Sequence, residues 1–284
     1  MITCEEIYDL HTTGALESAL CEAYREIPLD SRNSMRKNDT PLHMACAFVD
    51  ENAVRILLER GADVNVRNDD GDTPLCVLAK RKCCGKETTI AGIAGLLVSK
   101  EARVPRSGKN TTALIEAVGN RHFLMADILL MSGCRIDSTN SNGNNVLHVI
   151  CQSAGDIAYD IKRTKERIAD FSERWYSEKD KREAYENMEY LEEADRQCFL
   201  TAKRILENGQ IDTEDKNNIG KTALDIAWET GARRIGALLS GQDPDTDELS
   251  ALIGGLDVFQ ALWYKDMIAL DAILRSGTEL QTVC

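Results

Sequence analysis

DTPLHMACAFVDENAVRILLERGADVNVRNDDGDTPL, residues 39–75, opens and closes on the same four letters, so that DTPL recurs after 33 residues. A unit of this length cannot bury an apolar face alone, and several copies must stack to form a common core. The spacing therefore predicts an array of similar units along the chain.

Each unit reads as two short helices followed by a loop. Thr40 can cap the first helix through its hydroxyl group, and Pro41 suits the first helical position, where no backbone donor is needed. A second helix is indicated by apolar residues at helical spacing, namely Val54, Ile56, Leu57 and Leu58. Gly61 stands where this helix would end in a left-handed residue, and Gly71 turns the chain towards the next cap.

The chain resembles the ankyrin repeat family in three segments, TPLHMAC (40–46), LLERGADVN (57–65) and DTPL (72–75). The resemblance implies an all-α fold, a solenoid of helix-turn-helix-hairpin loop units with a concave surface. Further units match at corresponding positions. Asn145 and Thr222 each begin a unit, and two other units contain pairs at the spacing of Thr40 and Gly61, namely Thr112 with Gly133 and Leu256 with Gly277.

We expect residues 1–284 to form a single ankyrin-repeat domain. Its expected parts are an N-terminal cap repeat at 1–38, repeats at 39–71, 72–110, 111–143, 144–220 and 221–249, and a C-terminal cap repeat at 250–284. Within the N-terminal cap, residues 5–33 keep only a helix pair around Gly14. Its expected apolar contacts are Ile7, Leu10, Leu16 and Leu20.

The repeat at 144–220 contains an insertion at about 154–195 that predicts an antiparallel helical hairpin. One limb carries a seam at coiled-coil spacing, formed by Ile157, Ile161, Thr164, Ile168, Phe171 and Trp175. The other limb carries Ala184, Met188, Leu191, Asp195 and Cys198 at the same spacing. The two limbs, each about 20 residues and about 30 Å long, would join near 177–181. The hairpin could bind a partner, pair with a second copy or cover the array.

Cysteine and histidine positions favour structural roles. Cys46 and Cys151 lie six residues after a cap, where a small buried residue packs between helices. The resemblance implies that His43 and His148 bond to their own turns. Vicinal Cys83 and Cys84 lie among basic residues in an insertion around 80–89, and a solvated loop is expected there, with a reactive thiol pair as the alternative.

Composition excludes several classes of function. A formal charge of −13 opposes binding to phosphate backbones, so no nucleic-acid partner is expected. No apolar stretch is long enough to cross a membrane, and ten cysteines without an apolar signal segment indicate a reducing, cytoplasmic protein. We expect no cofactor, no metal and no catalytic residues, because neither a phosphate-binding glycine loop nor a paired CxxC motif occurs.

The resemblance implies that partner-binding residues lie at loop tips and at the ends of first helices. In this register they are Phe48, Arg67, Asp69, Asp70, Lys80, Arg81, Asn120, Asn142, Gln152, Trp263 and Tyr264. Phe48, Arg67, Trp263 and Tyr264 are the expected anchors, since aromatic residues and arginine dominate interface energetics. Trp263 and Tyr264 could instead pack on the acidic segment 240–249.

The expected function is therefore a scaffold that binds an unidentified protein partner. We expect a monomer. The alternatives are a structural protein that pairs through the hairpin, and a thiol switch at Cys83 and Cys84.

Overall fold

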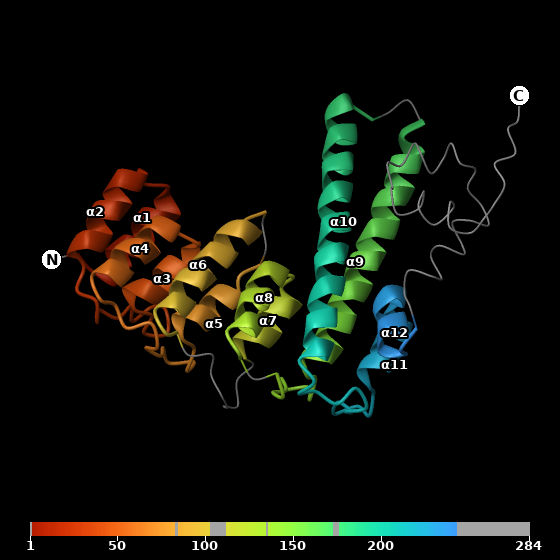
Figure 1. The fold of residues 1–284 in the computed structure, drawn as a ribbon. Helices are drawn as coiled ribbons and strands as arrows, with labels where there is room; N and C mark the ends of the chain where they lie inside the picture. Colours follow the sequence, from red (N-terminus) through yellow and green to blue (C-terminus); the bar gives the residue numbers. More distant parts are fainter. Residues whose placement is uncertain (1, 83–84, 103–111, 135, 173–175, 243–284) are drawn as a thin grey trace, which may run out of the picture. The chain divides into compact units, whose positions relative to one another are not determined.

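The computed structural model describes residues 2–82, 85–102, 112–134, 136–172 and 176–242 (Figure 1). These ranges contain α-helices, one short 3-10 helix and no strand, which confirms the all-α class. The chain divides into two units, Met1–Ala232 and Arg233–Cys284. The expected repeat boundaries remain a prediction, and the expected C-terminal cap repeat lies outside the described residues.

The first unit holds helices α1 to α11, and α12 lies in the second. Their bounds are α1 Cys4–Thr13, α2 Glu17–Glu26, α3 Pro41–Phe48, α4 Glu51–Glu59, α5 Pro74–Ala79, α6 Glu87–Ser99, α7 Ala113–Gly119, α8 Phe123–Met131, α9 Val146–Ala169, α10 Glu178–Glu207, α11 Ala223–Thr230 and α12 Arg233–Leu239.

Two layers of helices build the first unit. The first helices of successive repeats pack in order, α1 on α3, then α5, α7, α9 and α11, and the second helices pack likewise from α2 through α4, α6 and α8 to α10. From α1 to α10, each helix also packs on the other helix of its own pair. The core between the layers is aliphatic, with Leu42, Leu57, Leu75 and Ile93 among its fully buried side chains.

The caps agree with the sequence pattern. Every first helix from α3 to α11 starts at a predicted cap, namely Thr40, Thr73, Thr112, Asn145 and Thr222. Gly61 adopts φ of 87° and Gly133 φ of 74°, the left-handed region that glycine enters without steric cost. Cys46 and Cys151 are fully buried, as expected, whereas Trp228 occupies the same register in α11 and is 53% exposed.

The N-terminal helix pair forms as predicted, with one apolar contact wrong. Gly14 ends α1 in the left-handed region, and Ile7 is fully buried. Leu16, however, is the N-terminal capping residue of α2, and its side chain is 77% exposed. Tyr24 of α2 fills the core instead.

Helices α9 and α10 form the predicted hairpin and lie side by side (Figure 1). Its seam buries Ile157 and Thr164 of α9 together with Ala184, Leu191, Ala194 and Cys198 of α10. Ala194 takes the inward position expected for Asp195, because a small apolar side chain fits between two helices where a carboxylate would lose its water.

The predicted hairpin connection at 177–181 is wrong. Ser177 caps α10, and Asp180 bonds back to the Ser177 backbone, so the helix already includes 178–181. A Ser-x-x-Asp sequence satisfies two otherwise unbonded donors of a helix start. The connection therefore precedes Ser177. Of the seam, Phe171 lies just past the end of α9, and Trp175 is outside the described residues.

An ion pair to a buried carboxylate fixes the base of α10 on the preceding repeat. Asp127 of α8 is 7% exposed and pairs with Arg204 of α10. The Thr201 hydroxyl donates to the same carboxylate at 3.0 Å. Because a buried carboxylate without partners is costly, this cluster specifies how α10 sits on α8.

One helical glycine marks where α9 and α11 approach most closely. A Cβ at Gly155 would overlap the side chain and the backbone oxygen of Thr230. Gly155→Ala is therefore expected to destabilise the array by about 1–3 kcal/mol. The midpoint of urea unfolding, followed by circular dichroism, measures the effect.

Gly95 in α6 supplies the matched control, since a Cβ there meets nothing within 4 Å. Gly95→Ala should stabilise by up to about 1 kcal/mol, because alanine favours helix more than glycine does. Equal effects of the two substitutions would contradict the close approach at Gly155.

Candidate functional site at the hairpin loop tips

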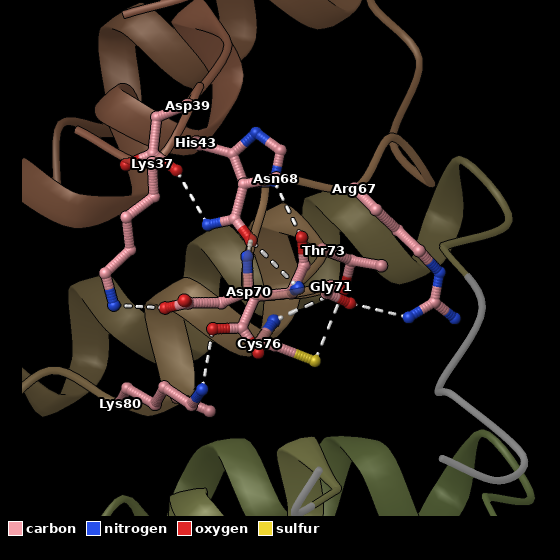
Figure 2. Close-up of polar contacts among 12 residues, drawn as sticks. Lys37, Asp39, His43, Arg67, Asn68, Asp70, Gly71, Thr73, Cys76 and Lys80 are labelled. Atoms are coloured by element: carbon pink, nitrogen blue, oxygen red, sulfur yellow. Dashed lines mark hydrogen bonds and ion pairs between the residues drawn. The ribbon is translucent and has the colours of Figure 1, made fainter. Parts of the chain in front are cut away.

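Asn68 organises the loop that joins the second and third repeats (Figure 2). Its Oδ1 accepts the backbone N–H of Asp70 at 3.1 Å and of Asp72 at 2.9 Å. Its Nδ2 donates to Asp39 Oδ1 of the preceding loop at 2.8 Å. The side chain thus closes its own turn and ties that turn to its neighbour.

His43 ties the same loop to the helix before it. Its Nε2 lies 3.0 Å from the Asp72 carbonyl, and its Nδ1 lies 3.2 Å from the Thr40 nitrogen. A carbonyl only accepts, so Nε2 carries the proton and Nδ1 accepts from the Thr40 N–H. Burial lowers the pKa of His43 below its ordinary value near 6.5, because desolvation disfavours the imidazolium.

The asparagine turn recurs in each loop that the structure describes. Four pairs share the bond from a backbone N–H to the side-chain oxygen two residues earlier, at 2.9 to 3.1 Å: Met35 to Asn33, Asp70 to Asn68, Asn142 to Asn140, and Ile219 to Asn217. His148 also repeats the role of His43, with its Nε2 3.0 Å from the Lys221 carbonyl. The residue two after each asparagine is therefore held at the tip of its loop.

Two of these tip residues are large and apolar. Met35 is 85% exposed and Ile219 is 73% exposed, whereas Asp70 and Asn142 supply polar tips between them. Met35 was not predicted as a binding residue, because its loop lacks the glycine that marks the other turns. Lys37 and Asn38, with φ of 55° and 54°, take the left-handed positions instead. An asparagine two residues before each tip is the signal that would have identified Met35.

Charged and amide side chains join neighbouring loops to one another. Lys37 pairs with Asp70, and Asn38 Nδ2 donates to Asp69 Oδ2 at 2.8 Å. At the other end of the array, Asn218 donates through its backbone N–H to the Asn142 carbonyl at 3.1 Å. Asp69, Asp70 and Asn142 are therefore both surface residues and links between repeats.

One ion pair recurs with its sign reversed. Lys80 at the end of α5 bonds Asp72 at 2.6 Å, where the Asp72 side chain is 6% exposed (Figure 2). In α11 the same two positions hold Glu229 and Lys221, which also pair. The positive charge of the Lys80 ammonium group is thus partly neutralised by the Asp72 carboxylate of the adjoining loop.

Arg67 points along its loop, where its Nη1 donates to the Gly71 carbonyl at 2.6 Å (Figure 2). The Arg67 carbonyl in turn accepts from Arg32 at 2.9 Å. Arg67 remains exposed, so its remaining donors face solvent.

Residues at helix ends divide into stacking clamps and exposed surface. The predicted residue Asn120 shares one kind of bond with Ser153 and Thr230, which were not predicted: a side chain donates to a backbone carbonyl of the preceding first helix, with acceptors Ala79, Val118 and Cys151 at 3.1, 3.0 and 3.4 Å. Asn120 is therefore a stacking clamp. Arg81 and Gln152 are exposed.

Phe48 lies half-buried against the N-terminal helix pair. Its ring stacks on His11 with centroids 4.0 Å apart and lies 5.6 Å from Tyr8. Part of its apolar surface is thus covered by the chain itself. Trp263, Tyr264, Cys83 and Cys84 lie outside the described residues.

Several cysteine thiols along the described chain are buried. Burial raises the pKa of Cys151 to about 12 and that of Cys134 to about 11, so neither forms a thiolate near neutral pH. Among the described residues, no group of three or more His, Cys, Asp or Glu could hold a metal ion. Within the same ranges, no helix is long and apolar enough to span a bilayer.

Comparison with known proteins agrees with the repeat geometry. A family model described as ankyrin repeats in many copies matches residues 27–76. An ankyrin repeat-containing protein of Schizosaccharomyces pombe is 34% identical over 68 residues, which are 22% of this chain and 33% of that protein. The phosphocholine transferase AnkX of Legionella pneumophila is 26% identical over 201 residues, 66% of this chain and 20% of that protein. The matches thus span about a third and a fifth of these relatives.

Replacing Asn68 tests the loop geometry. Asn68→Ala leaves two backbone donors and Asp39 without their partner, and should destabilise the array by about 2 kcal/mol. Asn142→Ala is the control, because its side chain is exposed at a tip, and should change stability by less than about 0.5 kcal/mol. Urea unfolding of both variants decides the matter, and equal effects would contradict the role of Asn68.

Stability should depend on pH through His43. Its pKa is lower in the folded protein than in the unfolded chain, so the unfolded chain binds the extra proton and acid favours unfolding. The contribution is fully present above about pH 6.5 and is lost as pH falls below that value. His43→Gln should make the unfolding free energy less steep between pH 7 and pH 5; an unchanged slope would contradict this.

Proposed function

We propose that this chain, an ankyrin-repeat protein, is a non-catalytic scaffold that binds a protein partner along its hairpin loop tips and first-helix ends. The observation that carries the proposal is the fixed presentation of the tips. In each described loop an asparagine side chain holds the tip residue's backbone, so its side chain projects from a turn that is already formed.

Such preorganisation favours binding because little conformational entropy is lost when a partner docks. Met35 and Ile219 supply exposed apolar area on rigid turns, and the tips between them supply a carboxylate and an amide. A matching partner would offer apolar pockets at two places and hydrogen-bond donors between them. Arg67, Lys80, Arg81 and Gln152 extend this surface towards the helix ends.

A binding role is also better supported than an enzymatic one. Phosphocholine transfer is the activity named for the Legionella relative, of which this chain spans about a fifth. The described histidines His43 and His148 are used as structural links between a helix and the next loop. These two histidines would therefore support the binding surface and take no part in catalysis.

Removing the two apolar tips tests the proposal. The wild-type chain is immobilised and exposed to lysate of its source, the enriched protein is identified by mass spectrometry, and its affinity is then measured by calorimetry. Met35→Ser with Ile219→Ser should weaken binding at least about tenfold, since anchors of this kind each contribute about 1 kcal/mol or more.

Met131→Ser is the matched control. Met131 ends α8, is not a loop-tip residue and is 84% exposed, so its loss removes the exposed apolar area of one methionine without touching a tip. Equal binding by the tip variant and the wild type would overturn the proposal, as would an equal loss in the Met131 variant.

A further inference from the structure

The distal part of the α9–α10 hairpin carries charges of opposite sign on its two helices. The exposed bases of α9 form a basic row, Lys162, Arg163, Lys165 and Arg167, which is interrupted by the exposed Glu166. The exposed acids of α10 form an acidic row, Glu183, Glu186, Glu189, Glu192 and Glu193, which is preceded by the exposed Arg182. Both rows lie on the parts of α9 and α10 that extend beyond the short helices α7 and α11, so neither row belongs to the repeat framework.

A hydrogen bond sets the register between the two rows. Asn187 Nδ2 donates to Thr164 Oγ1 at 3.2 Å across the seam. Because the helices run antiparallel, Lys165 lies level with Glu186, and Lys162 lies level with Glu189. The bases and acids of the two rows therefore stand at matching heights.

The rows are not consumed by pairing with each other. Within the described residues, the acidic row is paired only along α10 itself, where Glu183 bonds Lys179 at 3.7 Å and Glu193 bonds Arg196 at 3.0 Å. These surface pairs contribute little, since exposed partners are screened by water and salt. Both rows remain available to an outside partner.

The same region leaves aromatic side chains exposed to solvent. A two-helix layer has a single seam, and each helix leaves its other sides in solvent. Tyr159 of α9 is 65% exposed and Tyr185 of α10 is 57% exposed, beside the charged rows. Tyrosine at such positions gives contact area at small entropic cost when a partner helix covers it.

We propose that this surface, residues 158–169 of α9 with 181–193 of α10, mediates self-association, with α9 of one copy lying along α10 of a second copy. Placed at the same height, Lys162 meets Glu189 of the second copy and Lys165 meets its Glu186. The association is separate from partner binding at the loop tips.

Charge complementarity selects a second copy as the occupant. A wholly acidic helix would suit the basic row and be repelled by the acidic one, and a wholly basic helix would do the reverse. A second copy presents both rows in the same register, so both are satisfied at once. Where the contact does not close on itself, further copies add by the same contact.

Association of the full-length wild type is measured first, by sedimentation velocity and light scattering over a range of concentrations. At low salt the mass should rise with concentration from 31.5 kDa to at least twice that value. Raising the ionic strength should return it to one chain. A mass of one chain at every concentration overturns the proposal.

Charge reversal then locates the contact. Lys162→Glu with Lys165→Glu places two acids opposite Glu189 and Glu186 of a second copy, and Glu186→Lys with Glu189→Lys places two bases opposite Lys165 and Lys162. Each variant alone should stay at the mass of one chain, whereas an equimolar mixture should associate again. Association of either variant alone, or failure of the mixture to associate, overturns the proposal.

Arg25→Glu with Lys203→Glu is the control, because both side chains are exposed and lie outside the two rows. This variant should associate like the wild type. Circular dichroism of every variant checks that the helices form. Because the tip variants leave the hairpin untouched, their loss of partner binding would not alter this result.

Discussion

The hydrogen bond from His43 Nε2 to the Asp72 carbonyl is the link on which the loops depend. It joins the first helix of one repeat to the loop that begins the next, and the second bond of the ring, which Nδ1 accepts from the Thr40 N–H, forms only while Nδ1 is unprotonated. Asn68 closes the same turn from within, so the loop is held by side-chain bonds from two directions. The order of the tips is thus a consequence of buried polar groups that must all be satisfied.

The apolar core sets how the repeats stack, and polar clamps fix their register. Apolar burial is non-directional, so it could tolerate some sliding between helices. The bonds from Asn120, Ser153 and Thr230 to preceding carbonyls are directional and remove that tolerance. Stacked in this way, the repeats place tips such as Met35 and Ile219 on a common framework, which is what a binding surface requires.

The sequence predicted the local parts of this structure and missed the distant ones. Caps such as Thr40 and turns such as Gly61 follow from a few neighbouring residues, so their positions could be read directly. The stacking of Phe48 on His11 and the pair of Asp127 with Arg204 join residues far apart in the chain, and no spacing indicates them. The start of α10 was misplaced for a different reason, because its capping box was read as a loop.

Amide hydrogen exchange of the free protein, followed by NMR, tests most directly whether the tips are formed before any partner arrives. The backbone N–H groups of Met35, Asp70, Asn142 and Ile219 each have a side-chain acceptor. Exchange at these amides should be slower than in an unstructured peptide by roughly tenfold or more, since the bond must open first. Exchange at the rate of an unstructured peptide would show that the tips are mobile, and would contradict a preorganised binding surface.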